Sequence, residues 1–335
     1  MNKAQSIAII GAGAWGTTFA ILLSENGHEV KLWVLEEDLC SEMKEMRENK
    51  RYLPGFPIPS NIDLTSDLAE ALPSAKLIVF AVPSKHLRGI AKNSSAFISK
   101  DNIVLSVTKG LEENTHKRMS EVILDEIKSL DPKNLAILSG PNLSKEIAKG
   151  FPAASVVGSK SLETAKKIQG FLMMERFRVY TNTDVIGVEL GGALKNIIAI
   201  AAGAVDGLGL GDNAKAGLMV RGIAEITRLG VTLGAKQSTF SGLSGIGDLI
   251  ATCASKLSRN HYVGEEIAKG RKLKEILDGM EAVAEGVATT KAAHALAKKH
   301  KVEMPITEQV YQVLFEGKDP YKAIENLMIR SPKEE

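Results

Sequence analysis

The sequence predicts a two-part α/β protein: a doubly wound parallel sheet over residues 1–187, followed by an all-helical part over residues 188–330. Short apolar runs alternate with helical stretches in the first part, which is typical of a parallel sheet with helices on both faces. From Val185 onward, apolar residues follow helical spacing only. A glycine-rich turn directly follows the first apolar run. The runs expected to form strands are residues 6–10, 29–34, 76–82, 102–107, 135–139, 153–158 and 177–181.

Length and composition limit the kinds of protein to consider. A chain of 335 residues is long for one compact core, and 44% hydrophobic with 24% charged residues is ordinary for a globular protein. A net charge of +2 provides no polybasic surface for nucleic acid. The most apolar stretch, residues 185–210, contains Glu189, Lys195 and Asp206, which favours a buried core helix over membrane insertion.

The cysteines and histidines lead us to expect a cytoplasmic protein without a metal. Cys40 and Cys253 are far apart and provide no disulfide framework, which fits a reducing compartment. The six histidines have no ligand spacing with one another or with acidic residues. The N-terminal segment leads into the first expected strand without a cleavable signal pattern.

The glycine-rich turn has the spacing of a dinucleotide-binding site. Gly11, Gly13 and Gly16 follow the first expected strand and open a helix. In a Rossmann fold these glycines permit the tight turn, the approach of a pyrophosphate and close helix packing. Twenty residues after Gly16, Glu36 follows the second strand, where a carboxylate binds ribose hydroxyls and repels a 2′-phosphate. The alternative is a turn that serves packing alone, with Glu36 in solvent.

Lys195 stands in the middle of an apolar helix. Desolvation and neighbouring cations lower the pKa of a lysine, which can then donate a proton to a carbonyl oxygen and take it back. Gly191 and Gly192, one turn earlier, are expected to leave room for a ligand against the helix backbone. The alternative is a lysine that extends to the surface or pairs with an acid such as Glu189.

Two further positions fit the binding of an anion. Lys109 directly follows an expected strand, so its ammonium faces the crevice at the strand ends, as an anion or carbonyl binder. Ser258 begins an expected helix with Arg259 and Asn260 in its first turn, and a guanidinium beside helix N–H groups binds a dianion strongly. The alternatives are a solvated lysine, and a helix-capping serine beside a solvated arginine.

Seven segments resemble, in order, the NAD(P)-dependent glycerol-3-phosphate dehydrogenases, from Ile7 to about Leu327. They are GAGAWGTTFA, YLPG, VTKGLE, SGPNLSKE, GVELGGALKNIIAIAAGAVDGLGLGDNAKA, FSGLSGIGDLIATC and SRN. The resemblance implies reversible hydride transfer between NAD or NADP and carbon 2 of glycerol 3-phosphate or dihydroxyacetone phosphate, which supplies bacterial glycerophospholipid synthesis. It also implies a helical part similar to the C-terminal domain of 6-phosphogluconate dehydrogenase. Because the helical part is exposed, we expect a homodimer.

The resemblance implies roles for individual residues, with Lys195 as acid and base, supported by Asp248. The catalytic residues are Lys195, Asp248, Lys109 and Asn196. Substrate contacts come from Lys109, Gly140, Asn142, Lys195 and Asp248, with Ser258, Arg259 and Asn260 holding the phosphate. Cofactor contacts come from Gly11, Gly13, Ala14, Trp15, Gly16, Glu36, Lys109, Ser144, Arg259, Val283 and Glu285.

Three positions depart from the usual bacterial pattern of this family. Ala14 stands where serine is common, and Asn142 replaces a serine or threonine. Val34 and Leu35 occupy the place of a His-Arg pair that contacts the 2′-phosphate of NADP. Together with Glu36, this last difference leads us to expect a preference for NAD over NADP.

Two other kinds of protein share part of these features. A two-domain dehydrogenase for a hydroxy acid or a sugar acid needs a cation near the reacting carbon, and has no use for a separate phosphate site. A non-catalytic NAD-binding sensor needs neither Lys195 nor Asp248.

Overall fold

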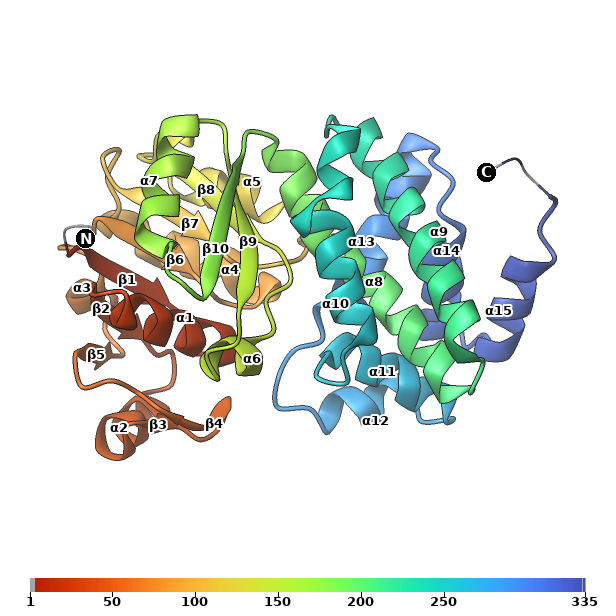
Figure 1. The fold of residues 1–335 in the computed structure, drawn as a ribbon, viewed down its shortest axis with the longest axis horizontal. Helices are drawn as coiled ribbons and strands as arrows, with labels where there is room; N and C mark the ends of the chain where they lie inside the picture. The colour runs from red at the N-terminus through yellow and green to blue at the C-terminus, as the bar shows by residue number, and fades with distance from the viewer. Residues whose placement is uncertain (1–3, 333, 335) are drawn as a thin grey trace.

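The computed structural model describes residues 4–332 and 334, which form a sheet-containing part and a helical part side by side (Figure 1). The strands of the main sheet are β1 (Ser6–Ile10), β2 (Glu29–Trp33), β5 (Ile62–Thr65), β6 (Leu77–Phe80), β7 (Ile103–Ser106), β8 (Leu135–Ser139), β9 (Ala153–Ser159) and β10 (Phe177–Asn182). Their order is β10-β9-β8-β7-β6-β1-β2-β5. Chain order therefore reverses between β1 and β6, where ligands of doubly wound folds bind.

The predicted fold class is confirmed, but the expectation of an entirely parallel sheet is wrong at one pair. All neighbouring strands are parallel except β8 and β9. The chain leaves β8 at its carboxyl end and forms the short helix α6 (Ser144–Ala148), which contacts α1 (Ala14–Glu25). It enters β9 from that same edge, so no crossover to the other edge takes place.

Helices cover both faces of the sheet. Alternate residues of β1 enter different cores: Ile7 and Ile9 pack with α1, and Ala8 and Ile10 pack on the opposite face. The first core also includes residues of α2 (Glu37–Met46), α6 and α7 (Leu162–Leu172); the second includes residues of α3 (Leu68–Ala71), α4 (Ser84–Ser94) and α5 (Met119–Glu126). Strand β5 and the small antiparallel pair β3 (Glu48–Asn49) and β4 (Leu53–Pro57) were not among the expected strands.

The second part has no strand in the described chain after Asn182. Its helices are α8 (Val185–Gly207), α9 (Gly211–Thr232), α10 (Asp248–Ala254), α11 (Arg259–Ala268), α12 (Leu273–Asp278), α13 (Glu285–His300), α14 (Pro305–Phe315) and α15 (Pro320–Met328). α8 is long and apolar enough to cross a membrane, yet 83% of its apolar window is buried inside the protein. It is the core helix of this part, with α9, α10, α11 and α13 packed around it (Figure 1). The expected boundary at residue 187 falls in its first turn and stays a prediction.

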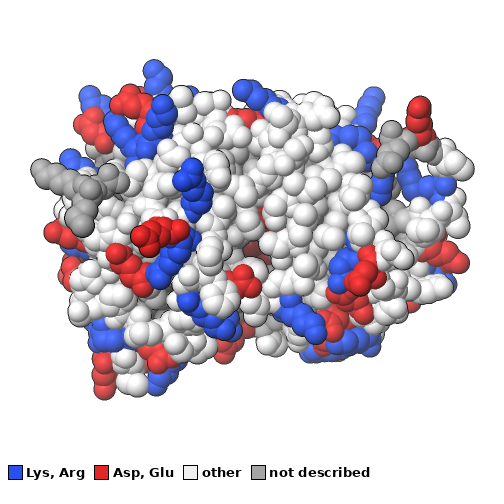
Figure 2. All heavy atoms as spheres, in the orientation of Figure 1, with Lys and Arg blue, Asp and Glu red and all other residues white. Residues whose placement is uncertain are grey.

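Charged side chains of both signs are spread over the two parts. On the face drawn in Figure 2, blue and red groups are interspersed, and the middle, where the parts meet, is largely uncharged. This mixed surface agrees with the net charge of +2.

α8 and α11 meet with their backbones in contact. A Cβ atom on Gly264 would lie 1.8 Å from the carbonyl oxygen of Ile200, and one on Gly203 would lie 1.9 Å from that of His261. Only glycine permits such an approach. Beside this crossing, the side chains of His261 and Asp206 lie 2.7 Å apart. The position of α11 along α8 is therefore fixed by both packing and a polar contact.

We predict that Gly264→Ala destabilises the protein by at least about 2 kcal/mol, because the added methyl group overlaps a backbone carbonyl. The control is Gly217→Ala at an exposed position of α9, where an added Cβ has no neighbour within 4 Å and should stabilise the helix by up to about 1 kcal/mol. Thermal unfolding of both variants measures the effects. Similar melting temperatures for the two would contradict the tight crossing.

Candidate active site

The ammonium group of Lys195 is buried and bonded within the protein. Lys195 is 5% exposed, and its Nζ donates hydrogen bonds to Asp248 Oδ1 and Thr252 Oγ1, both at 2.5 Å. Lys195 comes from the middle of α8, and its two partners occupy successive turns of α10. The alternative in which Lys195 pairs with Glu189 is wrong, because Glu189 pairs instead with Arg118 at 2.7 Å.

Lys109 joins the same carboxylate from the other part of the molecule. It follows β7, and its Nζ donates to Asp248 Oδ2 at 2.7 Å and to the carbonyl oxygen of Gly140 at 2.9 Å. Gly140 follows the neighbouring strand β8, with a φ of +137° that favours glycine. Asp248 is 1% exposed. One buried carboxylate is therefore shared by two lysines, which leaves a net positive charge beside the strand ends.

Burial lowers the pKa of Lys195 from 10.5 to about 8. Asp248 opposes this shift and the charge of Lys109 reinforces it. A lysine with a pKa near the working pH can both donate and accept a proton, as acid–base catalysis requires. The arrangement can supply a proton and a positive charge to a carbonyl oxygen placed beside it.

The glycines before Lys195 serve packing between protein segments, so the expectation that they leave room for a ligand is wrong. A Cβ on Gly191 would lie 2.4 Å from the carbonyl oxygen of Ser244, and one on Gly192 would lie 2.3 Å from Ser139 Oγ. Ser244 lies in a π-helical turn, Leu243–Gly247, that leads directly into α10. The small residues thus bring Asp248 close to Lys195.

The glycine-rich turn between β1 and α1 fits a dinucleotide. Gly11 has a φ of +112°, and a Cβ on Gly16 would lie 1.9 Å from the carbonyl oxygen of Gly11. At Gly13 an added Cβ has open space for 4 Å, and no side chain caps the start of α1. Open space beside an uncapped helix start fits the pyrophosphate of a bound dinucleotide. Ala14 and Trp15 form the first turn of α1, where the Trp15 ring packs on Phe19.

Residues that were not predicted from the sequence lie beside this turn and beside Glu36. Asn49, which is fully buried, donates to the carbonyl oxygen of Ala12 at 2.7 Å and to Thr17 Oγ1 at 2.8 Å. At the end of β2, the hydroxyl of Tyr52 makes a long 3.4 Å hydrogen bond to Glu36. The guanidinium of Arg51 lies 5.3 Å from the centre of the Tyr52 ring. The segment after β2 has no basic residue of its own, but Arg51 brings a positive charge near Glu36 through Tyr52.

The first turn of α11 carries the expected phosphate-binding residues. Ser258 caps the helix by accepting a hydrogen bond from the backbone N–H of His261 at 3.2 Å. The side chain of Arg259 is exposed, yet desolvation by surrounding protein lowers the pKa of its guanidinium. Asn260 is 8% exposed and donates to Asn196 Oδ1 at 2.9 Å.

The remaining predicted residues lie between β8 and α6, at the start of α6, and at or just before the start of α13. The carboxylate of Glu285, at the start of α13, accepts hydrogen bonds from the backbone N–H of Ser84 at 3.0 Å and from its hydroxyl. Burial raises the pKa of Glu285. Asn142 donates to Ser155 Oγ at 2.6 Å, and its buried Oδ1 has no partner in the described chain. Ser144 begins α6, where its carbonyl oxygen accepts from Thr18 of α1, and Val283 lies in the loop before α13.

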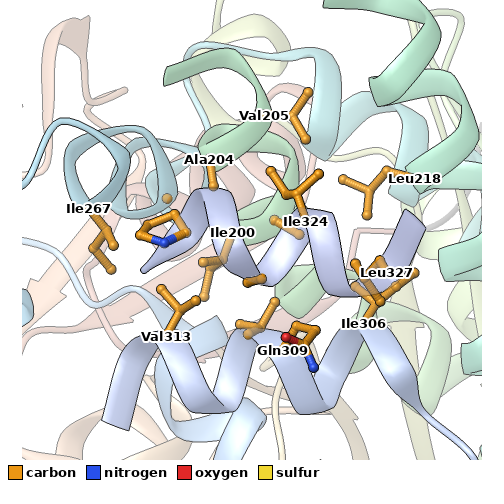
Figure 3. Close-up of a pocket in the computed structure, with 15 residues that line it drawn as sticks. Ile200, Ala204, Val205, Leu218, Ile267, Ile306, Gln309, Val313, Ile324 and Leu327 are labelled. Atoms are coloured by element: carbon orange, nitrogen blue, oxygen red, sulfur yellow. The ribbon is translucent and has the colours of Figure 1, made fainter. Parts of the chain in front are cut away.

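An apolar pocket lies on the side of α8 that faces away from Lys195, and it is unsuited to a phosphate ligand (Figure 3). Ile200 and Ala204 of α8 face Val313 of α14 and Ile324 of α15 across it. Its lining contains no charged side chain in the described residues. The same residues contain no group of three or more potential metal ligands from histidine, cysteine, aspartate and glutamate.

The strand-end glycine turn and the buried lysine–aspartate pair define the class as a two-domain nicotinamide-dependent dehydrogenase. The chain belongs to the NAD-dependent glycerol-3-phosphate dehydrogenase family, since residues 6–165 match the model of that family's N-terminus and residues 184–325 the model of its C-terminus.

Similar proteins agree with this assignment over nearly the whole chain. A glycerol-3-phosphate dehydrogenase (NAD(P)+) from Geobacillus kaustophilus is 49% identical over 99% of this chain and 96% of its own. The crystal structure of glycerol-3-phosphate dehydrogenase from Coxiella burnetii has a TM-score of 0.93 at 39% identity, covering 98% of this chain and 99% of its own. The corresponding yeast structure has a TM-score of 0.82 at 28% identity, covering 98% and 100%. The expected family, fold class and NAD(P)-dependent oxidoreductase class are confirmed.

We predict that Thr252→Val lowers the pKa of Lys195 further, because the Thr252 hydroxyl accepts a hydrogen bond from the ammonium form and stabilises it. We expect the pH at which kcat/KM for ketone reduction falls to half to move down by about one unit. Thr232→Val, an exposed change on α9, is the matched control. An unchanged pH profile in Thr252→Val would argue against this contact.

Proposed function

We propose that the chain catalyses the reversible reduction of dihydroxyacetone phosphate to sn-glycerol 3-phosphate with Lys195 as the proton donor and acceptor. The observation that carries the proposal is the buried group of two lysines on Asp248, in which the pKa of Lys195 is about 8. The activity for which the relatives are named, glycerol-3-phosphate dehydrogenase, supports the choice of substrate.

A bound nicotinamide dinucleotide supplies the hydride in reduction and accepts it in oxidation. In reduction, Lys195 stabilises the developing negative charge on the substrate oxygen and donates the proton that completes the hydroxyl group. Asp248 orients both lysines, and Lys109 adds a second positive charge. In oxidation, the free amine of Lys195 takes the hydroxyl proton.

The phosphate of the substrate binds at the start of α11, where the Arg259 guanidinium, Asn260 and the free N–H groups of the first turn form a dianion site. The Gly11–Gly16 turn holds the pyrophosphate of the cofactor and Glu36 holds the ribose hydroxyls. Glu285 and Val283 approach the cofactor from the helical part, and Ser144 from α6.

We further propose a cytoplasmic homodimer that supplies glycerol 3-phosphate to phospholipid synthesis. The net charge of +2 and the burial of α8 support this proposal. They fit a protein that acts on small molecules, away from nucleic acid and the membrane interior. The domain division at residue 187 is part of the same proposal.

The test of the function is NADH oxidation with dihydroxyacetone phosphate, compared with oxo acids. We expect activity with dihydroxyacetone phosphate and none with oxo acids. Lys195→Ala should lower kcat by roughly 10²- to 10⁴-fold. Since reduction requires the ammonium form, kcat/KM should fall above about pH 8, whereas in oxidation it should rise up to about pH 8. Activity with oxo acids instead would favour the hydroxy-acid dehydrogenase, and no activity would favour a sensor.

We predict a higher kcat/KM with NADH than with NADPH, because the Glu36 carboxylate repels a 2′-phosphate. Glu36→Ala should narrow the difference by roughly tenfold, which corresponds to about 1.4 kcal/mol. Arg51→Ala tests the positive charge near Glu36. It should lower kcat/KM with NADPH and leave kcat/KM with NADH unchanged. A clear preference of the unmodified chain for NADPH would overturn the assignment of Glu36.

A further inference from the structure

The segment that carries Lys109 connects two hydrophobic cores. Val107, two residues before Lys109, is 3% exposed and belongs to the core on the α1 face of the sheet. Leu111, two residues after Lys109, is 1% exposed and belongs to the core of the helical part. Every other described residue of that core comes from position 186 or later. Leu111 is therefore a side chain of the sheet part that is buried in the helical part.

The chain after Leu111 folds back and is bonded to α8. Leu111 and Arg118 form an antiparallel bridge, and the backbone N–H of Glu112 donates to the carbonyl oxygen of Lys117 at 2.9 Å. The guanidinium of Arg118 pairs with Glu189 of α8 at 2.7 Å. Both ends of this turn are therefore fixed on the helical part, Leu111 by apolar burial and Arg118 by an ion pair.

The link between Leu111 and Lys109 is short and packed. It consists of Gly110 alone, where an added Cβ would lie 2.9 Å from Ser84 Cβ and 3.2 Å from Glu285 Oε2. Two successive residues span at most about 7 Å of chain. If Leu111 leaves the helical core, the backbone of Lys109 must therefore move with it.

The side chain of Lys109 is long, flexible and close to a like charge. It is 18% exposed, and its Nζ shares the carboxylate of Asp248 with the ammonium group of Lys195. The two ammonium groups repel each other, and a lysine held in one orientation loses conformational entropy. A backbone that is fixed on both sides of Lys109 reduces the number of orientations open to it, which favours the contact with Asp248.

We propose that Leu111 is a positioning residue: its burial in the helical core holds Lys109 against Asp248. Leu111 acts through Lys109 and touches neither substrate nor cofactor. The inference deepens the proposed function, in which Lys109 supplies the second positive charge at the site, and it rests on that function.

The charge of Lys109 makes this role measurable at Lys195. The titratable groups that act on the pKa of Lys195 are Asp248, Lys109 and the thiol of Cys253. Burial raises the pKa of Cys253 to about 12, so the thiol is uncharged under assay conditions. Lys109 lowers the pKa of Lys195 and Asp248 raises it. When Lys109 moves away from Asp248, the pKa of Lys195 should therefore rise.

The first test is the pH profile of Leu111→Ala. We expect the pH at which kcat/KM for ketone reduction falls to half to move up by about half a unit to one unit, opposite in direction to Thr252→Val. The matched control is Leu314→Ala on α14, which removes the same atoms from the same core. It should lower the melting temperature and leave the pH profile unchanged. A lower melting temperature with an unchanged pH profile in Leu111→Ala would overturn the proposal.

Two milder variants test the proposal if Leu111→Ala does not fold. Leu111→Val removes one methylene group, so it should fold and give a smaller upward shift of the same profile. Leu111→Met keeps nearly the same volume and should retain the profile of the unmodified chain. An unchanged profile in Leu111→Val, or a larger shift in Leu111→Met than in Leu111→Val, would overturn the proposal.

A measurement that needs no activity separates this inference from the proposed function. NMR titration of the chain labelled with carbon-13 at lysine Cε reports the pKa of Lys195, whose signal is the one lost in Lys195→Arg. We expect Leu111→Ala to raise this pKa, but to have no further effect when combined with Lys109→Met, because the charge through which Leu111 acts is then absent. Equal shifts with and without Lys109 would overturn the proposal. Inactivity of the unmodified chain with dihydroxyacetone phosphate would overturn the proposed function, and this titration would still decide whether Leu111 positions Lys109.

Discussion

The site depends on a single carboxylate that is shared by two lysines from different parts of the chain. Asp248 accepts hydrogen bonds from Lys195 of α8 and from Lys109 after β7. Two ammonium groups this close repel each other, and burial adds a further cost to their charges. The carboxylate compensates for part of this cost, and the pKa of Lys195 stays lowered, at about 8. The same bonds hold the helical part against the carboxyl edge of the sheet.

The fold brings these groups together by close backbone contacts. Gly192 lets α8 pack against the end of β8, and Gly191 lets it pack against the turn before α10. Gly203 and Gly264 let α11 cross α8 with backbones in contact. As a result, Lys195, Asp248 and the start of α11 are all positioned from one central helix. Since packing determines these positions, small changes at the glycines should displace the whole site.

The sequence predicted those features that depend on local spacing or on motif order. The alternation of apolar runs predicted seven of the eight strands of the main sheet. The family resemblance implied that Lys195 and Asp248 share one site, and the structure places them in contact. The antiparallel return of β9 was not predictable, because apolar spacing carries no strand direction. Asn49, Arg51 and Thr252 were missed because turns and distant segments bring them to the site. The expectation that Gly191 and Gly192 leave room for a ligand was wrong. Small residues near a functional group can equally well make room for a neighbouring protein segment.

Three contacts across the junction share one chemical polarity, which the exposed pair of Lys291 and Glu113 reverses. At three contacts the helical part supplies the carboxylate and the sheet part supplies the donor: Asp248 with Lys109, Glu189 with Arg118, and Glu285 with Ser84. A chimera that combined this sheet with the helical half of a distant dehydrogenase would therefore keep donors that have lost their acceptors. Exchange of domains by recombination should succeed only where both halves preserve this matched set, so the two halves are expected to change together over evolutionary time.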